Sequence, residues 1–227
     1  MSFFGSWVVV WSVLAFAGSG IGQGPGQSQS SSSSSSSSKH GKSSSAPLVS
    51  DIGVGTFVNG VYRNRALGLS SKIPTGWVLR TDEMNSREEG DSGTEAATGE
   101  SQGGRVLLAA FSRPPEARGE DVNASLVIAA EPAATYPGLK EAAQYFGPVT
   151  EIAKAQGFTV DEEPYEVELG TKVVVRGDFH KDVGSRVMRQ STLVFLAHGY
   201  AVSITVIGGT EDEVEELMGG VKFGAAK

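Results

Sequence analysis

The chain has 227 residues, with 19 Lys and Arg against 26 Asp and Glu, which gives a formal net charge of -7. Nucleic-acid binding draws its affinity from Lys and Arg on phosphates, so this balance argues against it. The absence of cysteine excludes disulfides, thiolate catalysis and Cys-based zinc sites. Apolar residues make up 39% of the chain, which is enough for a core, and the sequence predicts no cofactor.

The first seventeen residues are typical of a leader. Phe3 to Ala17 form a nearly continuous apolar run without charge, and Ala15-Phe16-Ala17 has small residues where a cleavage site needs them. The run is shorter than the roughly 20 residues of a membrane-spanning helix. We therefore predict a signal peptide over 1–17, and hence an exported protein, periplasmic or extracellular. The alternative is an uncleaved anchor that would tether the domain to a membrane.

Residues 18–50 are predicted to be a flexible tether. They are rich in Gly and Ser and include nine consecutive serines, Ser30 to Ser38. Such a tract has no apolar surface to offset the entropy lost on ordering.

The sequence predicts one folded domain over 51–227. Only Lys39 and Lys42 carry charge before Asp51, so this part has 17 basic and 26 acidic residues and a net charge of -9. Residues 82–104 alone contribute -6, and they are rich in Gly, Ser and Thr without apolar periodicity. We expect a mobile acidic surface loop there, either a tolerated insertion or a docking segment.

Dense strand signals dominate the rest of the domain. Alternating or apolar runs predict strands at 56–64, 67–73, 105–111, 124–130, 171–181, 186–196 and 200–207. Several are joined by tight turns, such as Asp182 to Ser185, and tight turns imply antiparallel pairing.

Two helices are predicted between the strands. A single apolar stripe runs from Gly138 to Gln156, where Pro148 predicts a kink or two short helices. The second runs from Thr210 to Gly219, with Thr210 as N-cap and acidic residues in its first turn. The element order indicates an α+β fold, an antiparallel sheet covered by two helices.

Short motifs in this order resemble a known family. They are Ile73-Pro74-Thr75-Gly76-Trp77, then Glu168-Leu169-Gly170, Gln190-Ser191-Thr192 and Gly199-Tyr200-Ala201-Val202-Ser203-Ile204, and finally Val221-Lys222-Phe223. From about Gly55 to Phe223 the chain resembles the PsbP-like α/β/α sandwich of extrinsic photosystem proteins and DcrB-type exported bacterial proteins. The resemblance implies a non-enzymatic binding or assembly domain and brings no catalytic residues with it.

The sequence offers one candidate metal site. Asp178, His180 and Asp182 alternate, so on a continuous strand all three point to one face. Two carboxylates and an imidazole can hold a divalent cation. The alternative is the polar face of a half-exposed strand, which needs no ligand.

Two aromatic residues are candidates for a ligand pocket beside the sheet. Tyr62 and Trp77 lie in or next to predicted strands, where aromatic side chains also serve as core.

Two functions follow from these observations. The first is an exported, non-catalytic domain that binds an unknown protein partner or small ligand in an envelope-associated assembly. The second is an extracytoplasmic metal-assisted hydrolase that uses the Asp178, His180 and Asp182 face.

Overall fold

A computed structural model describes residues 51–91, 104–119 and 121–224. The predicted leader, the predicted tether and residues 92–103 of the predicted acidic loop lie outside these ranges. Within them, no helix combines the length and the apolar character needed to cross a bilayer.

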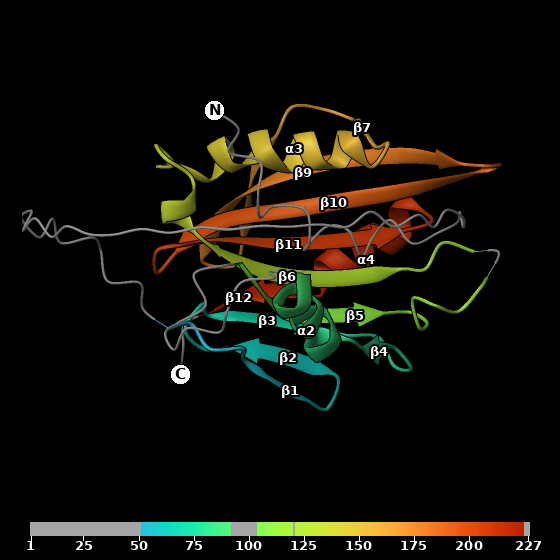
Figure 1. Cartoon of the computed structure of the whole chain (residues 1–227), viewed down its shortest axis with the longest axis horizontal. Coiled ribbons are helices and arrows are strands. Elements are labelled where there is room, and N and C mark those ends of the chain that lie inside the picture. The colour runs from blue at the N-terminus through green and yellow to red at the C-terminus, as the bar shows by residue number, and fades with distance from the viewer. Residues whose placement is uncertain (1–50, 92–103, 120, 225–227) are drawn as a thin grey trace, which may run out of the picture.

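Two antiparallel sheets form the domain, which confirms a sheet-rich, antiparallel α+β architecture (Figure 1). The small sheet has the order β1-β2-β3-β12, with β1 at Thr56–Val58, β2 at Val61–Asn64, β3 at Leu69–Lys72 and β12 at Val221–Phe223. The large sheet has the order β4-β5-β6-β11-β10-β9-β7, and β8 also pairs with β9. Its strands are β4 (Val78–Leu79), β5 (Arg105–Phe111), β6 (Ser125–Pro132), β7 (Thr159–Val160), β8 (Tyr165–Leu169), β9 (Lys172–Val183), β10 (Arg186–Ala197) and β11 (Tyr200–Gly208).

Two hairpins close through two-residue turns with positive φ at both positions. Asn59 and Gly60 join β1 to β2 with φ values of 51° and 73°, and His198 and Gly199 join β10 to β11 with 55° and 82°. These angles are those of the type I′ turn, whose twist matches that of paired strands. The stretch 56–64, expected as one strand, is therefore itself a hairpin.

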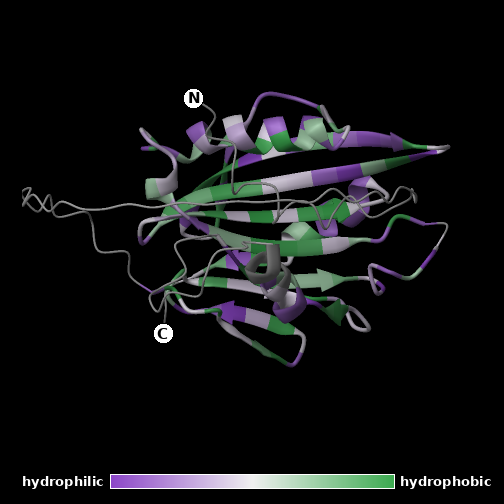
Figure 2. Ribbon diagram, in the orientation of Figure 1, coloured by the Kyte–Doolittle hydropathy of each residue, from purple (hydrophilic) through white to green (hydrophobic). Residues whose placement is uncertain are grey.

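The core lies between the two sheets. Buried and more exposed residues alternate in β2 and β12 of the small sheet, whereas β5, β6 and β11 of the large sheet are buried along most of their length. Figure 2 shows the hydropathy along the ribbon. One face of the large sheet packs through Leu126, Ile204 and Phe195 against the inner face of the small sheet and against helix α4 (Glu211–Gly219). The predicted N-cap of α4 is confirmed, because the Thr210 hydroxyl accepts a hydrogen bond from the Glu213 N–H at 3.1 Å.

The helical stripe at 138–156 divides as Pro148 predicted. A 3-10 turn, η3, covers Ala142–Tyr145, and helix α3 covers Phe146–Ala155; a second short turn, η2, covers Ala133–Thr135. Pro148 falls in the first turn of α3, where its missing N–H costs no helical hydrogen bond. Helix α3 packs on the other face of the large sheet, where Phe146 and Val149 join a cluster with Phe179.

Helix α2 (Thr81–Asp91) replaces the first part of the expected acidic loop. Its single deeply buried apolar side chain is Met84, so no apolar stripe marks it in the sequence. Polar side chains anchor it to β5 instead. The Asn85 amide bonds the N–H and C=O of Val106 at 2.9 and 3.0 Å, and Thr81 Oγ1 accepts from the Ala109 N–H at 3.0 Å.

Candidate functional site

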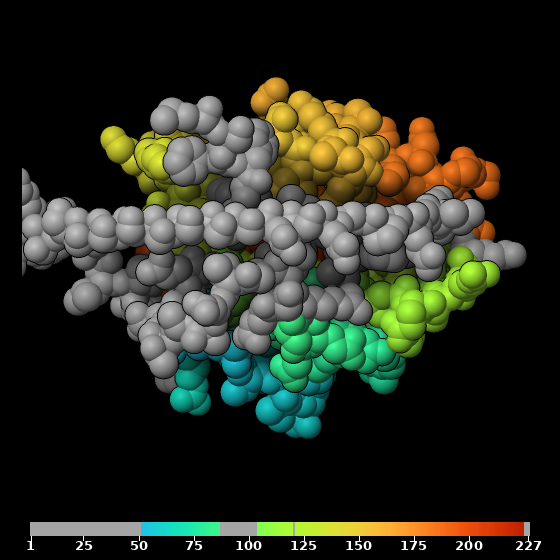
Figure 3. Space-filling view, viewed as in Figure 1, coloured from blue at the N-terminus to red at the C-terminus, as the bar shows by residue number. Residues whose placement is uncertain are grey.

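A groove lies between α3 and the strand that follows it. Its volume is about 430 Å³, within the usual range of ligand sites. It is lined by Thr150, Lys154, Phe158, Thr159, Val160, Glu163 and Pro164. Helix α3 stands at the molecular surface at this end, as the space-filling view shows (Figure 3).

The groove exists because of how α3 ends. Gly157, with a φ of +85°, follows the last turn, and its N–H bonds the Lys154 C=O at 2.9 Å. The Phe158 N–H then bonds the Ala153 C=O, also at 2.9 Å. These two bonds are the Schellman motif, which favours glycine at the left-handed position. The motif turns the chain back sharply, and Phe158, 5% exposed, enters both the core cluster and the groove lining.

Strand β7 forms the opposite wall and is held to β9 by backbone and side chains. Thr159 pairs with His180 and Val160 with Phe179. Past the strand, the Asp161 N–H bonds the Asp178 C=O at 2.9 Å. The position of this wall therefore depends on the part of β9 that carries the predicted metal residues.

His180 is engaged with a neighbour outside the predicted site. Its Nδ1 contacts Asp161 Oδ1, which ties the imidazole to the residue after β7. Both side chains are about one-third exposed. His180 thus links β9 to the end of β7, which forms one wall of the groove.

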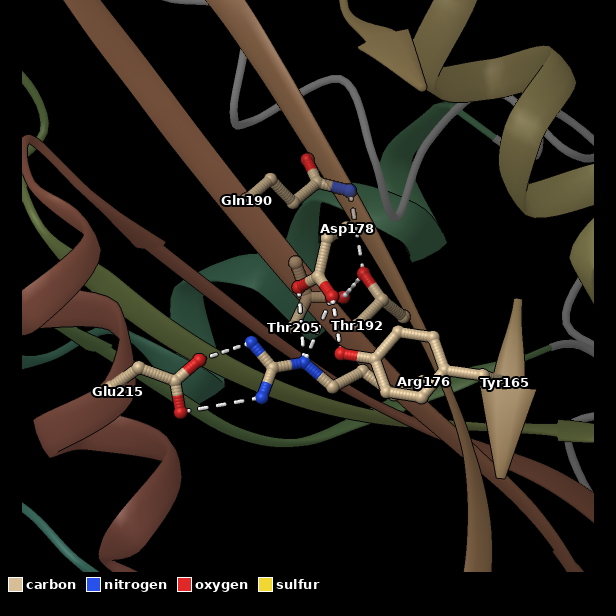
Figure 4. A network of polar contacts seen from close by, with 7 residues as sticks. All are labelled: Tyr165, Arg176, Asp178, Gln190, Thr192, Thr205 and Glu215. Atoms are coloured by element: carbon tan, nitrogen blue, oxygen red, sulfur yellow. Dashed lines mark hydrogen bonds and ion pairs between the residues drawn. The ribbon is translucent and has the colours of Figure 1, made fainter. Parts of the chain in front are cut away.

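Asp178 is held in a network that links three elements (Figure 4). Arg176 Nε lies 3.0 Å from both Asp178 carboxylate oxygens, and the Tyr165 hydroxyl donates to Asp178 Oδ2 at 2.8 Å. The other end of the guanidinium meets the Glu215 carboxylate on α4 in a bidentate pair. Arg176 and Asp178 keep only 15% and 18% of their side-chain surface exposed.

The network shifts two pKa values. Burial opposes the charge of Arg176, but its hydrogen bond to Glu215 and the charge of Asp178 outweigh it, so the pKa of the guanidinium is raised. Burial, together with the bond to Asp178, raises the pKa of Tyr165 to about 12. Arg176 therefore stays charged and Tyr165 stays a donor throughout the physiological pH range.

The structure does not bring the predicted metal residues together as ligands. Asp178 accepts hydrogen bonds from Arg176 and Tyr165, and His180 contacts Asp161. Asp182 is exposed near the β9–β10 turn. Within the described ranges, no group of three or more His, Asp or Glu side chains is arranged to hold a metal ion. Asp178 and His180 lie on one face of β9, as the alternation predicted. Their partners are the Arg176 guanidinium, the Tyr165 hydroxyl and the Asp161 carboxylate.

Tyr62 and Trp77 lie in and against the core. Tyr62 is 2% exposed, and its hydroxyl donates to the Val54 C=O at 3.0 Å. Trp77 is partly buried against the same cluster. Burial raises the pKa of Tyr62, which keeps its hydroxyl protonated and donating.

Sequence reasoning missed the groove. Its lining comes from α3, from β7 and from the β7–β8 connection, and no motif links them. One local signal was present: Gly157-Phe158 directly follows the helical stripe, as a glycine C-cap should.

Comparisons with known proteins leave the function open. No protein-family model matches the chain, and no curated protein matches it. Similar solved structures include a Pseudomonas aeruginosa protein of unknown function, described as a putative regulator. It is 16% identical, with a TM-score of 0.35, over 54% of this chain and 78% of that chain.

Two further similar structures carry printed roles. LpqN, involved in cell envelope biogenesis of Mycobacterium tuberculosis, is 12% identical with a TM-score of 0.31, over 68% of this chain and 82% of its own. The Saccharomyces cerevisiae Ran-binding protein Mog1p is 13% identical with a TM-score of 0.36, over 70% and 81%. With TM-scores this low, the function proposed below rests on the residues of this chain.

Proposed function

We propose that this chain is an exported, non-catalytic binding domain of the PsbP-like type, with helices covering its sheet, that takes a segment of a protein partner into the groove beside α3. The groove is the observation that carries the proposal. Its apolar residues are Phe158, Val160 and Pro164, and Thr150 and Thr159 are its neutral polar residues.

The charges of the groove fit a peptide rather than a uniformly charged ligand. Lys154 lies on α3 and Glu163 on the β7–β8 connection, so the two walls carry opposite charges. An extended segment with one apolar side chain and mixed charges can satisfy both walls. No histidine or cysteine is among the lining residues, so the lining offers no imidazole base and no thiol nucleophile.

The test is recovery of the same partner by matched variants. Val160→Arg places a long charged side chain in the groove, whereas Val183→Arg makes the same change at an exposed valine, 39% accessible, outside the groove lining. Full-length protein is purified from the host envelope, and the bound partner is quantified by mass spectrometry. We expect the partner with wild type and Val183→Arg and at least tenfold less with Val160→Arg. Equal recovery with both variants would contradict the proposal.

Export has a test of its own. Mass spectrometry of the protein from its host should find an N-terminus after Ala17, as the leader predicts. An intact Met1 in a cytoplasmic fraction would contradict export but would leave the groove proposal standing.

A further inference from the structure

The outer face of the small sheet carries a set of exposed cations. In β2, β3 and β12 the inner residues are directed to the core, as Tyr62, Leu69 and Phe223 show. The register then places the remaining residues on the outer face, which we call the basic face: Thr56, Val58, Val61, Arg63, Ser70, Lys72 and Lys222. Arg63 and Lys222 flank Ser70 in one row, and Lys72 lies in the next.

The cations of the basic face have no salt-bridge partner among the described residues. Among the residues that the structure describes, Arg63, Lys72 and Lys222 form no salt bridge, and all three are exposed. None of the seven residues of the face is acidic, although residues 51–227 carry a net charge of -9. The basic face therefore carries three cations and no acidic residue, which gives it a positive charge within an acidic domain.

Exposed apolar side chains border the same surface. Val54 is 55% exposed, Phe57 40% and Val58 55%, and they form half of the six large apolar side chains that are exposed in the described ranges. All three lie in or next to β1, which pairs on one side only, with β2. Val58 lies on the basic face itself, whereas Phe57 pairs with Tyr62 and lies on the opposite face of the strand. Exposed apolar residues that gather beside charges mark an interaction surface.

We infer that the basic face docks on an anionic lipid surface. Neighbouring strands are about 4.8 Å apart, so the three cations are spread over a flat face instead of converging on one point. Cations spread over a sheet face suit a plane of headgroups, and the exposed side chain of Val58 on the same face can enter the interface beside them. In Figure 1 the small sheet lies at the opposite end of the molecule from α3, so a membrane-docked domain keeps its groove open to a partner.

Binding to vesicles tests this inference. Full-length protein is sedimented with vesicles of phosphatidylcholine alone or with 30% phosphatidylglycerol. The double variant Arg63→Glu/Lys222→Glu removes the row of cations. The matched control Arg118→Glu/Lys140→Glu makes the same charge change at two exposed cations outside the basic face. Circular dichroism confirms that both variants fold.

We expect wild type to bind the anionic vesicles at least tenfold more tightly than the neutral ones, since each basic residue near such a surface contributes about fivefold. Binding should fall to the neutral level in the Arg63→Glu/Lys222→Glu variant and in 0.5 M salt, and it should persist in the control. The leader contributes equally to every sample, so it cannot produce these differences. Equal binding by the two double variants would overturn the inference, as would binding of wild type that ignores phosphatidylglycerol. Loss of partner in the Arg63→Glu/Lys222→Glu variant, without vesicle binding by wild type, would overturn it in favour of a protein interface.

Discussion

Arg176 connects three elements, β9, β8 and α4, through its own hydrogen bonds and those of Asp178. It lies on β9, bonds Asp178 on the same strand and reaches Glu215 on α4. Through Asp178 it also orients Tyr165 of β8. Only 15% of the Arg176 side chain is exposed, so its charge depends on Asp178 and Glu215 for stabilisation.

We expect Arg176→Met to lower the free energy of unfolding by about 2 kcal/mol, because it leaves Asp178 buried without a cation. Glu215→Gln should cost less than about 1 kcal/mol, since that side chain is half exposed, at 51%, and Arg176 keeps Asp178. Urea unfolding measures both. An equal loss in the two variants would show that Glu215, and not Asp178, dominates the network.

Tyr165 gives the same network a pH dependence. Its pKa lies at about 12, above the ordinary value of 10, so the stability from its bond to Asp178 is fully present below about pH 10. That stability should be lost as the pH rises through 12. Burial also raises the pKa values of Tyr62, Tyr136 and Tyr145, so the absorbance at 295 nm is compared between variants. The difference between wild type and Tyr165→Phe should be one tyrosine that ionises near pH 12, and this tyrosine should titrate at lower pH in Asp178→Asn. Unchanged titration in Asp178→Asn would contradict the assignment.

Sequence could predict one half of this network. Alternation along β9 placed Asp178 and His180 on one face, as observed. Their partners include Tyr165 of β8 and Asp161 after β7, at separations of 13 and 19 residues. Only tertiary contact decides such partners, so the sequence left a metal site open as the alternative to the polar face of a strand.

At the scale of elements, the periodicity of apolar residues predicted the strands and helices that bury an apolar face. The long strands β9, β10 and β11 and the helix α4 were recognised because each buries an apolar face. Helix α2 was missed because polar side chains anchor it. Strand β12 was not predicted as a strand because its pairing with β3, about 150 residues away, leaves no local mark. The β1–β2 hairpin could have been found, since Asn59-Gly60 is the standard signal for a type I′ turn.

The contact between α3 and β9 depends on a missing side chain. A Cβ at Gly177 would run into the ring of Phe146 at the start of α3. We expect Gly177→Ala to lower the free energy of unfolding by about 1–3 kcal/mol and to weaken partner binding, because α3 is a wall of the groove.

Gly147→Ala is the matched control. This glycine lies in α3, and no other atom lies within 4 Å of the position that a Cβ would take. Alanine should therefore stabilise the helix by up to about 1 kcal/mol. Thermal unfolding compares the pair. A harmless Gly177→Ala would mean that α3 can move away from β9 without cost.

At the scale of the whole molecule, two surfaces with different chemistry lie at opposite ends. The groove beside α3 is small, concave and of mixed charge, whereas the basic face is flat and cationic. Composition predicted an acidic domain but not that three of its 17 cations would share one sheet face, because the small sheet is assembled from both ends of the domain.

Site-specific photo-crosslinking in the host measures the central claim most directly. A benzophenone amino acid replaces Lys154, which lines the groove from α3, or Asp182 on the predicted metal face, in otherwise identical full-length proteins. The groove proposal predicts that position 154 forms one defined protein adduct and that position 182 forms none. An adduct from position 182, with none from position 154, would contradict it.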